Sequence, residues 1–404
     1  MKNKLFFQIL ILSLVFFIMA CSENENNNIT SDNESYDRIE ITSDQADLKS
    51  DLKYKKKEVK IKSGDKDLKD VDGYSFQLVA EVRQPETQNG YLVDATHVAI
   101  HANSAYVTYN YPGNIYAGGI HVFDISDPHI PKITSRIMFS DTDINAVTYH
   151  GDSLWVAGST ATYSGYENEN FESPAIIEEF RLKKGVFTNN TVKCDIPGFS
   201  ANSIIKTGNS LLVTSGNTYG GMFQISLSKS EYLQIKERYL FDNSKYVSYN
   251  KNMIVRLVSG VNAQLDIFEK KGEKLNFEES IDLGVIEPSD GKSVVHMDEK
   301  YIYISKGEFG IEVYDIKDLT KVLEFTTQLS KGNTNGVTTD SKFMYIANGA
   351  GGLYLASKPS KNMNSEILGK IDFKGSANYV ATNKNYIFVA CGSGGLKIFR
   401  IVNP

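Results

Sequence analysis

The chain repeats one motif about seven times, and this repeat constrains the fold more than any single residue does. Each copy has a short apolar run, a turn, and an aromatic or aliphatic residue followed by Val or Ile. The pairs are Tyr106-Val107, Trp155-Val156, Leu212-Val213, Ile254-Val255, Tyr303-Ile304, Tyr345-Ile346 and Phe388-Val389. Successive pairs lie 49, 57, 42, 49, 42 and 43 residues apart. A period just above 40 residues accommodates four short strands and their turns, so the repeat predicts an all-β propeller.

The first repeat divides into four strands by its apolar alternation. We expect an inner strand around 98–100, a second at 105–108, a third at 120–123 and an outer strand at 132–138. The seventh repeat stops after its third strand, whereas the run 74–82 precedes the first full repeat. We therefore expect 74–82 to complete the seventh four-stranded blade and close the ring. Rings of six or eight blades are the alternatives, because repeats 2 and 4 are irregular.

The first 20 residues have the features of an export signal. Lys2 and Lys4 precede an apolar stretch that is short for a membrane-spanning helix. The run Ile18-Met19-Ala20-Cys21 resembles the bacterial lipobox, in which cleavage leaves a Cys that is acylated on its thiol and amino group. Several acyl chains on Cys21 would make a stable anchor. The alternative is an ordinary signal peptide with an incidental Cys.

The segment after Cys21 is polar and rich in Asn, Asp, Glu, Lys and Ser. It buries too little apolar surface to order itself, so we expect a flexible tether over 21–72 and the propeller over 73–404. A short strand between Lys53 and Lys62 is the alternative there. The acidic cluster that follows Cys21 resembles the export signal of surface lipoproteins in Bacteroidetes. We expect an outer-membrane location at the cell surface, with the periplasmic leaflet as the alternative.

Several repeats share further motifs. Gly351-Gly352-Leu353 and Gly394-Gly395-Leu396 begin third strands, while Phe123-Asp124-Ile125-Ser126-Asp127-Pro128 and Tyr314-Asp315-Ile316 end them. Together with Asn before the inner strands, this pattern resembles the LVIVD-repeat family of bacterial propellers over about 96–400. The likeness is weak in repeats 2 and 4. It implies a propeller of the kind found on exported proteins, and it supplies no reaction and no catalytic residues.

Two long loops are candidates for ligand binding. In a propeller, the loops between second and third strands share one rim with the loops between blades. The loops 110–118 and 160–171 lie there and carry five aromatic rings: Tyr111, Tyr116, Tyr163, Tyr166 and Phe171. Exposed rings beside amides suit a carbohydrate or a peptide. The alternative is that these rings pack on one another and hold the loops.

A second candidate is a ring of amides at the start of the inner strands. Asn145, Asn202, Asn335 and Asn378 occupy one repeated position, and Thr96, Lys245 and Ser293 occupy it in the other repeats. Sevenfold geometry would gather these side chains around the channel mouth. They either bind a ligand there or tie each interblade turn to the next blade, as Asn commonly does in turns.

Signals for catalysis, metals and nucleic acid are weak. The net charge is −6 without a basic block, which argues against nucleic acid. Cys194 and Cys391 fall in distant repeats and lack metal-type spacing. His101, His150 and His296 fall in equivalent turns, where solvated residues are the simpler interpretation. Asp141-Thr142-Asp143 lacks the Gly and the distal Glu of an EF-hand loop. We expect no catalytic residue, no metal and no cofactor.

The sequence therefore predicts a lipid-anchored propeller that acts by binding a glycan, a peptide or a partner protein. Its membrane contact would be the lipid anchor at Cys21. A propeller enzyme, such as a polysaccharide lyase or hydrolase, is one alternative, and a scaffold subunit of an envelope complex is another. The aligned mouth positions are mostly Asn, Ser and Thr, which favours binding over catalysis.

Overall fold

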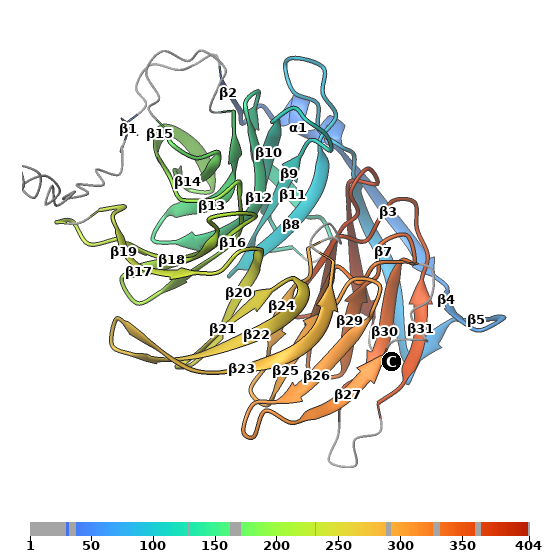
Figure 1. Ribbon diagram of the computed structural model, residues 1–404. Coiled ribbons are helices and arrows are strands. Elements are labelled where there is room, and N and C mark those ends of the chain that lie inside the picture. The colour runs from blue at the N-terminus through green and yellow to red at the C-terminus, as the bar shows by residue number, and fades with distance from the viewer. Residues whose placement is uncertain are drawn as a thin grey trace, which may run out of the picture.

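The chain forms a ring of seven blades, each an antiparallel sheet (Figure 1). The computed structural model describes residues 30–31, 38–127, 129–161, 171–230, 232–287, 292–325, 332–359 and 365–402. Blade 1 comprises β8 (Asp94–His101), β9 (Ser104–Asn110), β10 (Gly118–Asp124) and β11 (Lys132–Phe139). All four strands expected in the first repeat are therefore present, and each is longer than its apolar run.

The next five blades follow in chain order. Blade 2 comprises β12 (Thr142–His150), β13 (Ser153–Thr160), β14 (Ala175–Lys183) and β15 (Val186–Asp195). Blade 3 comprises β16 (Ser200–Thr207), β17 (Ser210–Gly216), β18 (Gly221–Ser226) and β19 (Ile235–Leu240). Blade 4 comprises β20 (Ser244–Asn250), β21 (Met253–Val258), β22 (Gly260–Lys271) and β23 (Lys274–Ile286). Blade 5 comprises β24 (Val295–Met297), β25 (Tyr301–Ser305), β26 (Ile311–Asp315) and β27 (Lys321–Phe325). Blade 6 comprises β28 (Gly336–Thr339), β29 (Phe343–Ala347), β30 (Leu353–Ser357) and β31 (Ile367–Ile371).

The seventh blade joins the two ends of the propeller. It contains β32 (Tyr379–Asn383), β33 (Tyr386–Ala390) and β34 (Leu396–Val402), and its fourth strand is β7 (Tyr74–Val82). β7 pairs antiparallel with β34 from Leu396 opposite Val82 to Val402 opposite Ser75. The predicted closure of the ring by the 74–82 strand is confirmed, as is the count of seven blades.

The segment before β7 lies against the outside of the ring, which the sequence analysis did not expect. We call residues 38–72 the belt. Its elements are β2 (Ile39–Thr42), α1 (Gln45–Asp51), β3 (Leu52–Val59), β4 (Ile61–Ser63), β5 (Lys66–Leu68) and β6 (Asp70–Val71). β2 extends blade 1, β3 extends blade 7 and β4 extends blade 6, while β1 (Thr30–Ser31) pairs with β15 of blade 2. Figure 1 shows the blue belt strands beside the red C-terminal blades.

The predicted tether over 21–72 is therefore wrong from Arg38 onward. Few apolar side chains of the belt are buried in the structure. They are those of Leu48, Leu52, Ile61 and Val71. Its remaining stabilisation comes from main-chain pairing with blade edges, which a polar composition does not reveal. Lys53 to Lys62 holds most of β3, so the short-strand alternative was the correct one for that run.

Two buried charged clusters fasten the belt. Arg38 binds Glu178 through both terminal nitrogens, at 3.1 and 2.9 Å, and Asp141 through Nε at 3.1 Å. Asp51, at the end of α1, binds Arg83 at 2.9 Å and Arg136 at 2.6 Å and lies 3.6 Å from His121 Nε2. Although burial alone raises the pKa of Asp51, His121 and the two arginines lower it to about 2.

The core consists of apolar layers between neighbouring blades. Phe139 of blade 1 packs on Phe180 of blade 2 with ring centroids 5.4 Å apart. Similar layers join the other blades and leave the central channel lined by the inner strands. Within the described part of the chain, no helix is long and apolar enough to cross a membrane.

Candidate functional site

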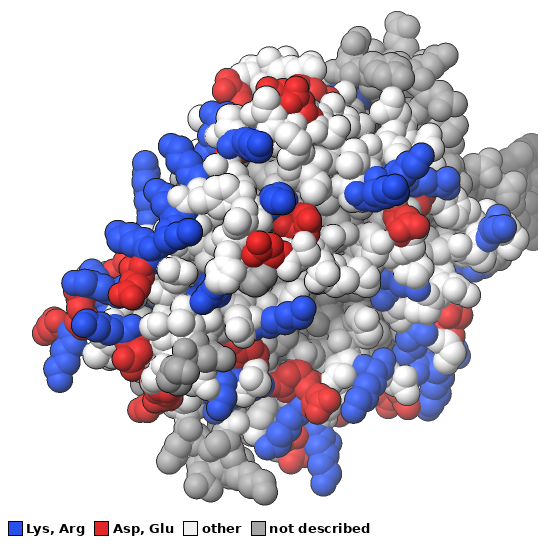
Figure 2. Space-filling model, turned by 180° about the vertical axis from the view of Figure 1, so that it is seen from behind, with Lys and Arg blue, Asp and Glu red and all other residues white. Residues whose placement is uncertain are grey.

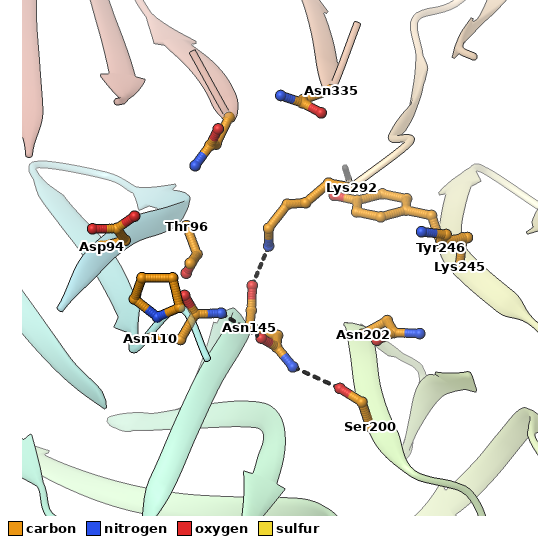
Figure 3. A pocket seen from close by; sticks show the side chains of 12 residues that line it. Asp94, Thr96, Asn110, Asn145, Ser200, Asn202, Lys245, Tyr246, Lys292 and Asn335 are labelled. Atoms are coloured by element: carbon orange, nitrogen blue, oxygen red, sulfur yellow. Dashed lines mark hydrogen bonds between the residues drawn. The ribbon is translucent and has the colours of Figure 1, made fainter. Parts of the chain in front are cut away.

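The channel opens on one face into a cavity of about 340 Å³ (Figure 3). Its walls come from the starts of the inner strands, from the loop after β9 and from the connection before β24. The lining residues are Asp94, Thr96, Asn110, Pro112, Asn145, Ser200, Asn202, Lys245, Tyr246, Lys292, Asn335 and Asn378. We call this cavity the mouth. All four predicted ring asparagines line it, whereas Ser293 is absent from its lining.

Irregular pairing explains how several of these side chains reach the mouth. The register between the first two strands shifts at Thr96, Asn145, Asn202 and Lys245 in blades 1 to 4. A β-bulge adds one residue to a strand and re-aims its side chain. The repeated position of the sequence is therefore a repeated bulge, with Asn335 and Asn378 directly before their strands in blades 6 and 7.

Five of the ring residues clasp their own blade to the next one. Asn145 Nδ2 donates to the Ala201 carbonyl at 3.0 Å, and Asn202 Nδ2 donates to the Ser244 carbonyl at 3.0 Å. The same pattern continues with Asn335 to Ala377 at 3.1 Å, Asn378 to Ala95 at 3.5 Å, and Thr96 Oγ1 to Ile144 at 3.0 Å. In each case the acceptor directly precedes the next ring residue. The structure thus shows the interblade role that was one of the two alternatives for these asparagines.

The clasps leave hydrogen-bonding capacity at the mouth. Asn335 Oδ1 is buried and has no hydrogen-bond partner among the described residues. Ser200 Oγ accepts from Asn145, and Asn145 Oδ1 accepts from Asn110. The walls therefore offer amide and hydroxyl groups that are already held in position.

Lys292 is the functional candidate that the sequence analysis missed. Its side chain extends across the mouth from the connection before blade 5, and Nζ donates to the Asn145 carbonyl on blade 2 (Figure 3). Burial and the neighbouring Lys245 cation lower the pKa of Lys292 to about 7. In the alignment of the repeats, Ser293 occupies the ring position of repeat 5. Its φ of 48° turns the backbone away from the course that it follows in the other blades, so the side chain of Lys292 enters the mouth instead. The inner strand of repeat 5 is short, and this shortness was the signal that could have indicated an irregular ring position.

Two tyrosines lie at the base of the mouth. Tyr246 lines both the mouth and a second cavity of about 250 Å³, and its hydroxyl lies 3.2 Å from that of Tyr379. Lys292 Nζ sits 5.9 Å from the Tyr379 ring centroid. His97 packs on the same ring at 4.2 Å, and burial lowers its pKa well below the usual value. The tyrosine pair therefore divides the channel into two compartments.

The rim of blades 1 and 2 is partly packed. Tyr111 is half-buried against Tyr91, with ring centroids 5.1 Å apart, and Lys193 Nζ lies 4.9 Å from the half-buried Phe171 ring. Burial raises the pKa of the half-buried Tyr116. Tyr163 and Tyr166, like Cys21, lie outside the described residues. Packing therefore accounts for Tyr111 and Phe171, and the ligand platform stays a prediction.

Asp143 holds the first rim loop in place. It accepts hydrogen bonds from the main-chain nitrogens of Tyr111 at 3.2 Å and Ala117 at 3.1 Å. Burial outweighs these bonds and raises the pKa of Asp143 to about 7. Asp141 instead pairs with Arg38 of the belt, so Asp143 holds the rim loop whereas Asp141 helps to hold the belt.

The described residues contain no group of three or more His, Cys, Asp or Glu that could hold a metal. His101 and His150 end their inner strands, and His296 bonds Thr339 Oγ1 at 3.0 Å. Basic and acidic side chains are intermingled on the face shown in Figure 2. At the left edge of that face, several basic side chains gather with few acidic ones between them.

No family model matches the chain, and no curated relative matches its sequence. Its structure is similar to the RRP9 WD40 repeats, with a TM-score of 0.56 and 7% identity, covering 80% of this chain and 100% of that one. It is also similar to the WD40 β-propeller domain of Doa1, with a TM-score of 0.49 and 13% identity, covering 80% and 96%. At 7% identity the likeness to RRP9 shows the propeller fold alone.

Proposed function

We propose that this propeller is a binding module whose ligand is a glycan that enters the mouth and extends over the rim of blades 1 and 2. The observation that carries this proposal is the mouth itself, a cavity of about 340 Å³ with a wall of amides and hydroxyls. Sites for small ligands span roughly 300–1,000 Å³. Amides offer both a donor and an acceptor to sugar hydroxyls, and the Tyr246 side chain lies at the base of the mouth.

Binding fits the mouth better than glycoside hydrolysis does. A hydrolase needs a pair of carboxyl groups on either side of the scissile bond. Asp94 is the one carboxylate among the described lining residues, and its Oδ1 accepts a 2.6 Å hydrogen bond from Gln84. The mouth therefore has many groups that can bind a ligand, but among its described lining residues the Asp94 carboxylate has no second carboxylate beside it.

We further propose that Cys21 carries the lipid anchor and that the protein lies at the outer-membrane surface as an LVIVD-type lipoprotein. The lipobox-like run before Cys21 supports the anchor. Arg38 follows Cys21 by 17 residues, which at about 3.5 Å per residue reach at most about 60 Å. Metabolic labelling with a radioactive fatty acid should mark the wild type but not Cys21→Ala. Surface proteolysis of intact cells then separates the outer from the inner leaflet.

The ligand proposal is tested by blocking the mouth. Pro112 is exposed and lines the mouth, so Pro112→Trp places a large ring there with little effect on folding. Ile115→Trp is the matched control, because Ile115 is 40% exposed in the same loop and does not line the cavity. On a glycan array, residues 22–404 should bind, Ile115→Trp should bind equally, and Pro112→Trp should lose binding by about tenfold or more. Equal binding by both variants contradicts a ligand in the mouth.

The rim platform has its own test. Tyr163→Ala with Tyr166→Ala should weaken binding of a long oligosaccharide more than binding of a monosaccharide, because only the longer ligand reaches the rim. An unchanged affinity for both ligands removes these two rings from the proposed site.

A second candidate, docking of a partner protein, is favoured by one observation. Phe199, Tyr219, Leu240, Phe241 and Val261 are between 42% and 79% exposed and lie on adjoining loops and strand ends of blades 3 and 4. Main-chain bonds join these loops, for example Phe241 to Gly220 and Ser259 to Asn243. Exposed apolar groups that cluster in this way mark interaction surfaces. A photo-crosslinker at Val261, but not at Phe277 on the blade 4 edge, should then form one defined adduct in cells.

A further inference from the structure

A smaller cavity adjoins the mouth between blades 3 and 4. Its volume is about 110 Å³, and we call it the groove. Ser200, Asn202 and Lys245 line both the groove and the mouth, and Figure 3 shows them on the same side of the mouth. The rest of the groove is lined by Gly216, Asn217, Asn243 and Ser259. Because small-ligand sites begin at roughly 300 Å³, the groove serves as an extension of the mouth rather than as a separate site.

Three exposed aromatic rings lie beside the groove. Phe199, Tyr219 and Phe241 are each within two residues of a residue that lines it. Their exposed fractions are 51%, 79% and 42%. Arg256 Cζ lies 5.5 Å from the centroid of the Phe241 ring, whereas Tyr219 is the most exposed of the large apolar side chains that the structure describes. Tyr219 is therefore the ring that a ligand in the groove reaches most easily.

The backbone beneath Tyr219 is held in a fixed conformation. Its φ is 64°, which is uncommon for a bulky residue. Asp242 Oδ1 accepts a hydrogen bond from the Tyr219 main-chain nitrogen at 3.0 Å, and the Gly220 carbonyl accepts one from the Phe241 nitrogen at 3.2 Å. A left-handed residue persists only where its surroundings determine it. The loop that carries the ring is thus preorganised, which lowers the cost of ordering it on binding.

We propose that the groove and the rings beside it form a second subsite, into which a glycan bound in the mouth extends, and that this glycan is a neutral β-linked glucan. This inference rests on the proposed glycan-binding function and specifies its ligand class and its path. All the free hydroxyls of a β-linked glucose ring are equatorial, so its two faces are flat and carry C–H groups. Such a face stacks on the Tyr219 ring, while the sugar hydroxyls bond the amides of Asn217 and Asn243.

The test measures binding of two hexasaccharides, cellohexaose and laminarihexaose, and of their disaccharides by calorimetry on residues 22–404. Tyr219→Asn removes the ring and keeps a residue type that tolerates left-handed backbone. Tyr249→Asn is the matched control, because Tyr249 is 48% exposed and lies near the far end of the inner strand of blade 4. We expect wild type and control to bind one hexasaccharide about tenfold or more tightly than its disaccharide. Tyr219→Asn should lose about fivefold or more of the affinity for that hexasaccharide and none for the disaccharide.

Fluorescence gives a second measurement that reports on the subsite itself. The chain has one tryptophan, Trp155, which is 3% exposed. Tyr219→Trp therefore adds an exposed indole at the groove. The hexasaccharide should shift the emission of this variant to shorter wavelength in a saturable way, because the sugar removes the indole from water, whereas the disaccharide should not. Tyr249→Trp should respond to neither sugar.

The outcomes separate this inference from the proposed function. If Tyr219→Asn binds the hexasaccharide as tightly as wild type, or if Tyr219→Trp gives no shift, the second subsite is wrong. Loss of the Val261 adduct in the same Tyr219→Asn variant would then assign the rings to a partner protein. If wild type binds neither hexasaccharide, the glucan inference is likewise wrong. Failure of the proposed function shows instead as equal binding by Pro112→Trp and Ile115→Trp on the glycan array.

Discussion

Lys292 Nζ donates a hydrogen bond to the main-chain oxygen of Asn145, across the channel from blade 5 to blade 2. Asn145 itself clasps blade 2 to blade 3 through Ala201. Asn145 thus connects two blades through its side chain and accepts a hydrogen bond from the Lys292 amine through its main chain. A ligand that displaces Lys292 would act on the same residue that holds two blades together.

The Arg38 cluster should contribute strongly to stability. Arg38 is 2% exposed, and replacing it with Met leaves Glu178 and Asp141 as buried charges without their cation. We expect a loss of about 3–5 kcal/mol in the free energy of unfolding, measured in urea. Arg38→Met with Glu178→Gln should recover part of this loss. Lys60→Ala breaks an exposed pair with Asp67 and should change stability by less than about 1 kcal/mol.

Asp51 should make the attachment of the belt sensitive to acid. Its pKa of about 2 lies below the ordinary value of 3.8, so its stabilisation is complete above about pH 4 and is lost as the pH falls toward 2. The shift corresponds to about 2 kcal/mol. Asp51→Asn should therefore be less stable than wild type at pH 7, with a difference that shrinks between pH 4 and pH 2. A difference that is constant over this range would contradict the assigned role.

The structure explains why the Gly-Gly-Leu motif has a glycine at position 395. Its φ is +69°, and a Cβ there would lie 2.0 Å from the Val82 carbonyl of the closing strand. Gly395→Ala must therefore push β34 away from β7, and we expect a loss of more than about 2 kcal/mol in thermal unfolding. Gly64→Ala is the control, because its φ is +58° and its Cβ would meet nothing within 4 Å. Gly64→Ala should cost only about 1 kcal/mol.

The sequence predicts the blades well because short apolar strands, separated by turns, repeat with a regular period. It also identifies the closing strand 74–82, since Phe76, Val79 and Val82 are placed to pack on a sheet. It does not reveal the belt, because an edge strand such as β3 pairs through its main chain and has mostly exposed lysines.

The candidate site could be predicted in part. The ring of asparagines follows from one repeated position, and the interblade clasp follows from the known behaviour of Asn in turns. Lys292 does not follow, because its entry into the mouth depends on the left-handed backbone of the next residue. The hydrogen bond from Lys292 to the Asn145 carbonyl could be established only from the distance between the two groups.

The most direct measurement of the central claim compares glycan binding by Pro112→Trp and Ile115→Trp, because Pro112 lines the mouth and Ile115 lies in the same loop outside it. A ligand in the mouth predicts that Ile115→Trp binds a glycan as the wild type does, whereas Pro112→Trp loses about tenfold or more of the affinity. Equal binding by both variants would contradict a ligand in the mouth.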